Sequence, residues 1–232
     1  MRLYADGVFP TASGRARFHD CTFKQTADVP GDLFPLRLTT GRLRDQWHGM
    51  SRTGLVLQLF THAPEPMLGL HAIDMASRGL ADGDVARVNT RRGTMHVRVS
   101  TCADLQPGVA YLPMHWGSQF MTGTGINVLT TGAFDPVSKQ PELKHAAIQV
   151  AKITVGWRLM AARVVDDPHA TMQQLAPLLA RFDYASLSPA GSNRQAVVLR
   201  AWHCEAPHES LIAAIDSILD IDAEACELVI DD

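Results

Sequence analysis

Short apolar runs, separated by Gly, Pro, Asp and Asn, recur between about Pro35 and Val150. Within these runs apolar and polar residues alternate with the period of two that is typical of strands with one buried face. The pattern predicts strands at 36–38, 85–88, 95–99, 109–112 and 148–150. Because the strands are short and the turns between them are frequent, we expect a compact β-barrel.

One helix is expected to interrupt these strands, at residues 71–78. The stretch from His71 to Ala76 has apolar residues at helical spacing, and Gly79 can cap the end of the helix. A turn rich in Gly and Asp then leads into the strand at 85–88. Arg91-Arg92-Gly93 turns that strand into the next one, which predicts a hairpin.

The beginning of the chain predicts a lead-in hairpin. Residues 2–10 and 14–18 have the composition of two short strands around a turn.

The pattern of apolar and polar residues changes after about Thr154. We expect a helix at 171–182, a loop rich in Ser, Pro and Gly at 186–193, a strand at 196–201 and a helix at 208–219. These elements predict a small α/β module. Its helices look amphipathic and its loops carry no recognisable site, which favours a packing or spacer role.

Composition limits the classes of function. The chain has 232 residues, of which 46% are hydrophobic, as one large or two modest globular domains require. Its 21 basic and 24 acidic residues give a net charge of -3, so we expect local anion pockets at most and no nucleic-acid partner. No apolar run approaches the roughly 20 residues that cross a bilayer, and the first residues form no hydrophobic signal core. We therefore expect a soluble, cytoplasmic protein with no membrane partner.

The four cysteines, Cys21, Cys102, Cys204 and Cys226, lie far apart in the sequence. No Cys-x-x-Cys spacing is present that would predict a zinc site or an iron-sulfur cluster. We expect all of them to be ordinary reduced thiols, and we predict no metal ligands in this chain.

A first candidate loop, residues 39–48, follows the predicted strand at 36–38. Gly41 can take a positive φ angle and let the backbone approach a ligand, while Arg42 can form two hydrogen bonds with a phosphate and Thr40 can add a hydroxyl donor. Such a loop suits a heterocycle that carries phosphate. The alternative is a turn with a solvated arginine, which is the more common role of a Thr-Gly-Arg triplet after a strand.

A second cluster runs from Pro113 to Thr130 and contains His115, Trp116 and Asn127. Asn127 can donate and accept hydrogen bonds simultaneously, which suits the edge of a pterin or guanine ring, although a loop Asn also commonly caps a turn. His115 and Trp116 can equally be residues wedged at the end of a barrel strand. Gly123 and Gly125 do not form a dinucleotide fingerprint, because the third glycine and the strand-to-helix setting are missing.

The third cluster, residues 135–144, is a stiff loop with two prolines and two lysines. Its Lys144 can neutralise a pyrophosphate as a point charge, whereas a loop lysine is otherwise a solvated surface residue.

In this order and around these spacings, the three clusters resemble the molybdopterin-dinucleotide-binding domain of the large molybdopterin oxidoreductases. They are most similar to the assimilatory nitrate reductase type. The resemblance extends from about Leu3 to Ile153. Residues 9–18 match the family's lead-in, residues 40–48 its first cofactor loop, and residues 135–144 its last.

The resemblance implies a mainly β fold, in which a six-stranded double-psi β-barrel with its lead-in hairpin spans residues 1–153. A small α/β extension is expected over residues 154–232. The implied cofactor is molybdenum bis(molybdopterin guanine dinucleotide), held at one end of the barrel. The resemblance implies cofactor contacts for Thr40, Gly41, Arg42, Gln46, Trp47, His48, His115, Trp116, Asn127 and Lys144.

The sequence departs from a complete enzyme of this family, which has a cysteine cluster for a four-iron centre and central domains that provide the molybdenum ligand. We therefore expect a fragment of a longer polypeptide, with iron-sulfur clusters only in domains absent from this sequence. The remaining domains of that polypeptide are its expected partners. This chain is expected to be inactive alone and to contain no catalytic residue.

The resemblance implies a role in the reduction of nitrate to nitrite, with nitrate as the substrate of the full enzyme. Two alternatives stay open. One is the equivalent domain of a formate dehydrogenase, and the other is a stand-alone, non-catalytic binding barrel.

Overall fold

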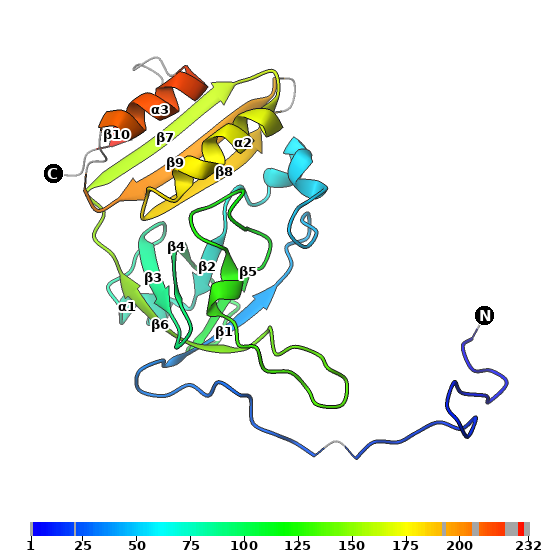
Figure 1. Cartoon of the computed structure of the whole chain (residues 1–232). Coiled ribbons are helices and arrows are strands. Elements are labelled where there is room, and N and C mark those ends of the chain that lie inside the picture. Colours follow the sequence, from blue (N-terminus) through cyan, green and yellow to red (C-terminus); the bar gives the residue numbers. More distant parts are fainter. Residues whose placement is uncertain (1, 21, 192–193, 206–208, 221–226, 230–232) are drawn as a thin grey trace.

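The computed structural model describes residues 2–20, 22–191, 194–205, 209–220 and 227–229. Six strands close into a barrel in the order β1-β5-β2-β4-β3-β6 (Figure 1). The strands are β1 (Leu36–Gly41), β2 (Met67–Leu70), β3 (Val85–Asn89), β4 (Thr94–Thr101), β5 (Val109–Pro113) and β6 (Ala146–Lys152). The mainly β fold and the six-stranded barrel predicted from the sequence are confirmed.

Period-two burial explains why the sequence predicted five of these strands. In β4, Met95, Val97 and Val99 are buried in the barrel core while the side chains between them are more exposed. Strand β2 was missed, because its residues Met67-Leu68-Gly69-Leu70 include a glycine and show no polar alternation. Both faces of β2 are covered, so burial erases the pattern that marks a half-exposed strand.

Short helical segments connect the strands. Helix α1 (Ala72–Ala76) lies inside the predicted 71–78 helix, and Gly79 follows it with a φ of 62°. Three 3-10 helices, η1 (Thr53–Leu55), η2 (Leu57–Phe60) and η3 (Ile126–Leu129), occur in the loops. No helix among the described residues is long and apolar enough to cross a membrane.

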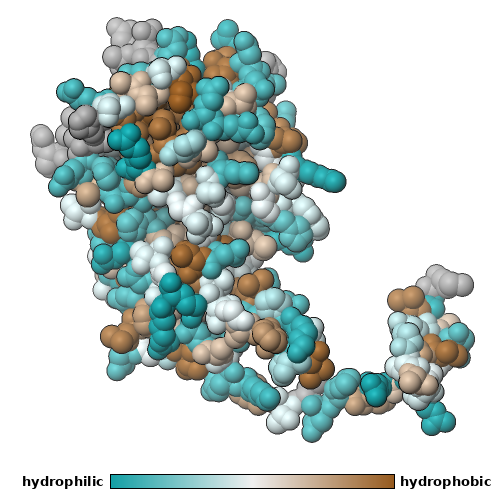
Figure 2. Space-filling model, in the orientation of Figure 1, coloured by the Kyte–Doolittle hydropathy of each residue, from teal (hydrophilic) through white to brown (hydrophobic). Residues whose placement is uncertain are grey.

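The predicted lead-in hairpin is wrong. Residues 2–20 contain turns and no strand, with Phe9 N donating to Gly14 O at 3.0 Å. Figure 2 shows this segment standing away from the body of the molecule. Leu3 and Phe18 are 80% and 97% exposed, so no hydrophobic face is buried that would stabilise an isolated hairpin.

The C-terminal part forms a second sheet, in the order β10-β7-β9-β8, with every described pairing antiparallel. Helices α2 and α3 contact each other, and α2 packs on β8 and β9 (Figure 1). The chain order is β7 (Trp157–Val164), α2 (Pro168–Leu179), β8 (Tyr184–Ala190), β9 (Ala196–His203), α3 (Glu209–Leu219) and β10 (Glu227–Val229). This β-α-β-β-α-β order is a split βαβ arrangement. The division into domains at 153 and 154 stays a prediction.

The predicted loop at 186–193 is wrong over residues 186–190, which belong to β8. Ser186 and Ser188 are buried there, and Ser188 Oγ accepts a hydrogen bond from Arg200 Nη1 at 2.9 Å. A strand can carry serines inward when they find polar partners, which the sequence alone does not show. The other predicted positions Ser192, Asn193, His208, Cys21 and Cys226 lie outside the described residues.

A buried polar cluster joins the barrel to the second sheet. Glu65, which precedes β2 and is 7% exposed, accepts hydrogen bonds from Arg98 Nη1 at 2.6 Å and Tyr184 Oη at 2.7 Å. Arg200 Nε lies 4.0 Å from the same carboxylate. Burial, together with the charge of Glu65, raises the pKa of Tyr184 well above its ordinary value, so the phenol stays protonated and donates.

Candidate functional site

Three loops meet at one end of the barrel, because β1 lies between β5 and β6 and pairs with each of them in a fixed register. β1 runs parallel to β5, with Gly41 beside Pro113. β6 is antiparallel to β1 and begins with Ala146 beside Leu38. The loops that follow β1, follow β5 and precede β6 therefore lie together. They are the three loops in which the sequence predicted the site.

One cavity, of about 410 Å³, brings together Thr40, Asn127 and Lys144. Lys144 Nζ donates to Thr40 O at 3.3 Å, and Thr40 Oγ1 donates to Leu143 O at 3.0 Å. These contacts tie the loop before β6 to the end of β1. The ammonium of Lys144 and the amide of Asn127, from two loops, are thus placed around one hollow beside Thr40 of β1, and both can donate to a phosphate-bearing ligand.

A second cavity, of about 440 Å³, is lined by His48, His115, Trp116 and Asn127. It shares Met114, Ile126 and Asn127 with the first cavity. The two hollows therefore adjoin across the exposed side chain of Asn127, at the start of η3. Together they offer room for an elongated ligand with a charged end and a heterocyclic end.

His115 fastens the first loop from the inside. Its Nε2 accepts a hydrogen bond from Leu43 N at 2.8 Å, so Nδ1 carries the proton and donates to His48 O at 2.7 Å. Burial lowers the pKa of His115, and the charge of Arg42 adds to this effect against the raising influence of the His48 carbonyl. The neutral imidazole therefore uses both of its nitrogens in hydrogen bonds to the backbone of the first loop, and these bonds fix the shape of that loop.

The positive φ angle that the sequence suggested for Gly41 is found at His48 instead. Gly41 does not have a positive φ; a Cβ there would lie 2.9 Å from Tyr111 Cε2, so the small residue is needed for packing. The positive φ belongs to His48, at 44°, in the turn held by His115. The prediction of a positive φ angle at Gly41 is therefore wrong.

Arg42, Gln46 and Trp47 lie in the same loop, and they and Gly41 line neither of these two cavities. The guanidinium of Arg42 stacks over the ring of the exposed Trp47, with 4.7 Å from Cζ to the ring centroid. Gln46 is buried and donates from Nε2 to Leu59 O at 3.0 Å. The structure therefore groups six of the ten predicted residues around the cavities and places these four beside them.

Gly125 lets two parts of the second loop approach each other closely. Its φ of 81° and ψ of -171° belong to a region that is essentially restricted to glycine. A Cβ at this position would also collide with the carbonyl oxygen of Trp116. The sequence analysis excluded a dinucleotide fingerprint at this glycine, and the structure shows that it lets two backbone segments touch.

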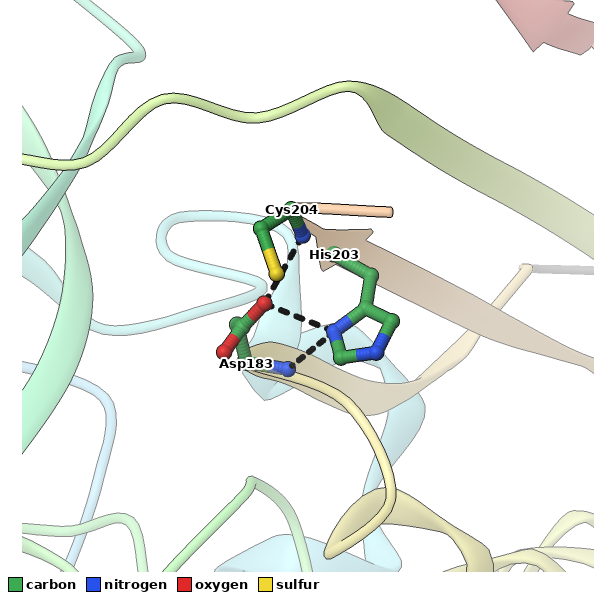
Figure 3. Close-up of side chains that lie close together, drawn as sticks. All are labelled: Asp183, His203 and Cys204. Carbon is green, nitrogen blue, oxygen red and sulfur yellow. Dashed lines mark hydrogen bonds and ion pairs between the residues drawn. The ribbon is translucent and has the colours of Figure 1, made fainter. Parts of the chain in front are cut away.

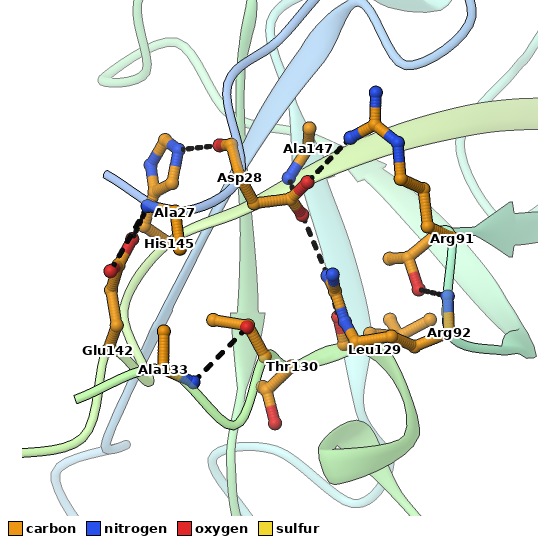
Figure 4. A network of polar contacts seen from close by, with 12 residues as sticks. Ala27, Asp28, Arg91, Arg92, Leu129, Thr130, Ala133, Glu142, His145 and Ala147 are labelled. Atoms are coloured by element: carbon orange, nitrogen blue, oxygen red, sulfur yellow. Dashed lines mark hydrogen bonds and ion pairs between the residues drawn. The ribbon is translucent and has the colours of Figure 1, made fainter. Parts of the chain in front are cut away.

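A polar network beneath the loops was not predicted (Figure 4). Asp28, 3% exposed, accepts hydrogen bonds from Arg91 Nη1 at 2.8 Å, Arg92 Nη2 at 2.7 Å and Ala147 N at 2.9 Å. Burial alone would raise the pKa of Asp28, but the bonds from Arg92, Ala147 and Arg91 hold it below its ordinary value. Asp28 is therefore a charged anchor inside the protein.

The same network reaches the second and the third of the three loops. Arg92 Nη2 also donates to Leu129 O at 2.9 Å, at the end of η3. His145 Nε2 lies 2.6 Å from Asp28 O, directly after Lys144, and Ala27 N donates to Glu142 Oε1 at 3.0 Å. The segment around Asp28 thus contacts both the loop of Asn127, through Arg92, and the loop of Lys144, through the Asp28 main chain and Ala27 N. The Arg91-Arg92 pair was visible in the sequence, but its partner lies more than sixty residues away.

The residues around the two cavities fit a dinucleotide with a heterocycle. Trp116, 3% exposed, lines the larger of the two, and its Nε1 has no hydrogen-bond partner among the described residues. An unpaired buried donor is costly and is commonly matched by a ligand or an ordered water. Together with the ammonium of Lys144 and the amide of Asn127, it provides donors suited to phosphate and ring acceptors.

A protein-family model matches the barrel region. The model described as "Molydopterin dinucleotide binding domain" matches residues 36–147. This range begins at β1 and ends in β6, and it includes every candidate site residue.

Curated relatives match a longer stretch. A nitrate reductase from Klebsiella oxytoca is 35% identical over 145 residues, which cover 62% of this chain and 17% of the relative. A nitrate reductase from Shewanella frigidimarina is 31% identical over 175 residues, which cover 66% of this chain and 18% of the relative. The chain thus spans less than one fifth of the length of these curated relatives.

Among solved structures, the acetylene hydratase from Pelobacter acetylenicus matches with a TM-score of 0.42 and 19% identity, covering 51% of this chain and 18% of that one.

Proposed function

Residues 36–147 belong to the molybdopterin dinucleotide binding domain family, and from this premise we propose that the chain is the cofactor-holding part of a nitrate reductase. In this proposal the barrel binds the guanine form of the dinucleotide, as molybdenum bis(molybdopterin guanine dinucleotide). The observation that carries the proposal is the meeting of Thr40, Asn127 and Lys144 around one cavity at the end of the barrel.

The roles of the residues follow from their chemistry. Lys144 would neutralise phosphate charge, and Asn127 would pair with the edge of a ring through its amide. Arg42 and Trp47, stacked on each other at the surface of the first loop, would add a cation and an aromatic face. Gln46 and His115 would act indirectly, since both are buried and hold the loop from within.

The cofactor, when bound, would supply the oxygen-atom chemistry that converts nitrate to nitrite, while the residues of this chain bind and orient it. Nitrate is favoured by the relatives, which are named nitrate reductases. The remaining domains of the longer polypeptide would complete the cofactor cage. An assay of the full-length enzyme with nitrate and with formate separates this proposal from a formate dehydrogenase.

The binding role is tested on the chain itself by isothermal titration calorimetry with guanosine diphosphate. We expect Lys144→Ala to weaken binding by about 10-fold or more, since a charge-assisted hydrogen bond contributes roughly 1.5–3 kcal/mol. The matched control is Lys139→Ala in the same loop, because the Lys139 ammonium lies over the Phe134 ring at 5.3 Å and lines neither cavity.

If the Lys144→Ala and Lys139→Ala variants bind guanosine diphosphate with equal affinity, Lys144 does not belong to the binding site. Arg42→Ala tests the exposed cation of the first loop in the same way. A titration with cytidine diphosphate tests the choice of base, because the guanine form of the proposal requires tighter binding of the guanosine compound.

A further inference from the structure

Three side chains with metal-binding atoms meet where β9 ends: Asp183, His203 and Cys204 (Figure 3). One donor atom from each, a carboxylate oxygen, an imidazole nitrogen and the thiol sulfur, lies within 4.8 Å of the other two. Asp183 Oδ2 is 2.6 Å from His203 Nδ1 and accepts a hydrogen bond from Cys204 N at 2.8 Å. Cys204 is exposed and the other two are partly buried, so solvent ions can reach the group.

The pairing of β8 with β9 creates this cluster. Tyr184 pairs with Trp202, so Asp183, just before β8, comes to lie opposite His203, at the end of β9. The sequence did not reveal the group, because Asp183 lies 20 residues before His203 and meets it only through this register. A search for Cys-x-x-Cys patterns cannot find it.

The surroundings hold the three residues in place. The ring of His203 meets the ring of Phe182 edge-on at 6.3 Å, and Phe182 stacks on Trp157 at 5.8 Å. The main-chain oxygen of Asp183 lies 2.9 Å from Nδ1 of His96, in β4 of the barrel. Within the described part of the chain, the only ion pair of Asp183 is with His203, so no Lys or Arg there occupies its carboxylate.

The donor set selects the class of ion. Nitrogen, sulfur and oxygen donors from three side chains are typical of zinc and similar divalent transition metals, whereas magnesium and calcium prefer oxygen ligands only. Distances up to 4.8 Å between donor atoms are compatible with bonds of roughly 2.0–2.3 Å to a common centre after small side-chain rotations. Three protein ligands leave a fourth position to water.

We propose that Asp183, His203 and Cys204 bind one divalent transition-metal ion of the zinc class, which clamps the end of β9 to the start of β8. The site is separate from the two cavities at the barrel end. It adjoins the barrel, because Asp183 also lines a cavity of about 250 Å³ with His96 and with Gly123 and Gly125 of the second ligand loop. A bound ion would therefore stiffen the junction between the barrel and the C-terminal sheet.

The test uses the whole chain, stripped with a chelator and kept reduced. Calorimetric titration with Zn²⁺ should show one tight equivalent, and Co²⁺ should give a visible spectrum with a thiolate-to-metal absorption band. Cys204→Ser should remove that band and weaken Zn²⁺ binding by at least 10-fold. His203→Ala and Asp183→Asn should each weaken binding, and Zn²⁺ should raise the Tm of the unmodified chain but not of these variants.

The matched control is Cys102→Ser, which removes the other described free thiol, a half-buried one in the barrel. It should leave the stoichiometry and the cobalt spectrum unchanged. Absence of a tight equivalent, or a cobalt thiolate band that survives Cys204→Ser, would overturn the proposal. Far-UV circular dichroism of each variant without metal distinguishes loss of a ligand from loss of the fold.

Guanosine diphosphate binding should persist in the Cys204→Ser variant. Failure of the metal proposal and failure of the cofactor proposal can therefore be told apart.

Discussion

The barrel and the C-terminal sheet deal with unpaired strand edges in different ways. Each barrel strand has two neighbours, since the sheet closes from β6 back to β1. The C-terminal sheet is open, and β8 lies at one edge. That edge is covered by residues 120–122 of a barrel loop, with Leu187 N donating to Phe120 O at 2.7 Å and Thr122 N donating to Ala185 O at 2.9 Å. An open edge without such cover would invite pairing with other chains.

The difference shows what the C-terminal sheet contributes to the site. The loop that completes its edge also carries Ser118 and Gln119, which line the candidate cavity of about 440 Å³, and it leads on to Asn127. The barrel sheet closes without this loop, and the open C-terminal sheet pairs with residues 120–122 of it. The C-terminal elements therefore support a wall of the candidate site as well as packing against the barrel.

The junction between the two regions is the most sensitive point. Glu65→Ala would leave Arg98 and Arg200, with side chains 24% and 13% exposed, without their buried partner. We expect a loss of about 3–5 kcal/mol in the free energy of unfolding, the range for breaking a buried ion pair on one side. Urea unfolding followed by circular dichroism measures this loss. If the cluster couples the barrel to the C-terminal sheet, the Glu65→Ala variant should unfold in two separate transitions.

Arg163→Ala serves as the control for that experiment, because Arg163 pairs at 2.6 Å with Asp220, whose side chain is 91% exposed. A surface pair of this kind contributes at most about 1 kcal/mol. Similar losses for Glu65→Ala and Arg163→Ala would mean that the two regions are joined by apolar packing instead.

The second prediction concerns the loop itself. Gly125→Ala should cost about 1–3 kcal/mol through its backbone conformation alone, and more through the collision with Trp116 O. Gly123→Ala is the matched variant, since Gly123 has a similar φ of 84° but open space around its Cβ position. Gly125→Ala should be the less stable of the two in thermal unfolding and should bind guanosine diphosphate more weakly. Equal effects of the two variants would show that the close approach to Trp116 is unimportant.

The barrel could be predicted because its strands leave one side exposed or end at clear turns. The alternation at 95–99 and the turn at 91–93 are local signals that survive in the fold as β4 and its hairpin. β8 could not be predicted, since Ser186, Ser188 and Pro189 have the composition of a loop. Its strand exists because distant groups, Glu65 and Arg200, satisfy the inward-facing hydroxyls.

In the candidate site, too, local features could be predicted from the sequence and contacts between distant residues could not. Thr40, Asn127 and Lys144 could be proposed one by one from their side-chain chemistry, and the registers of β1 with β5 and with β6 explain why they meet. Two contributions were out of reach of the sequence. Asp28 acts across more than one hundred residues on Ala147, and the role of His115 depends on the direction of both ring nitrogens.

The third prediction tests the network beneath the loops. Asp28→Asn should lower the free energy of unfolding by about 1.5–3 kcal/mol near neutral pH, the range for hydrogen bonds to a charged group. Because the pKa of Asp28 is lowered in the folded protein, this stability is present above the ordinary carboxyl range, about pH 4, and is lost as the pH falls through the lowered value. The gap between the two proteins should therefore shrink below about pH 4 in denaturation measured at several pH values. A gap that stays constant with pH would show that the carboxylate charge is not what stabilises the loops.

The smallest effect is expected at the shared edge itself, where Thr122 Oγ1 donates to Leu179 O at 2.8 Å and accepts from Ala185 N at 2.8 Å. Thr122→Val keeps the shape but removes both bonds, which should cost about 1–2 kcal/mol. Thr61→Val is the control, because its hydroxyl makes one exposed bond, to Gln58 O at 2.7 Å. If the C-terminal sheet holds the ligand loop, Thr122→Val should also weaken guanosine diphosphate binding in the titration, while Thr61→Val should not. Unchanged binding by a destabilised Thr122→Val protein would limit the sheet to a packing role and leave the loop positioned by the barrel alone.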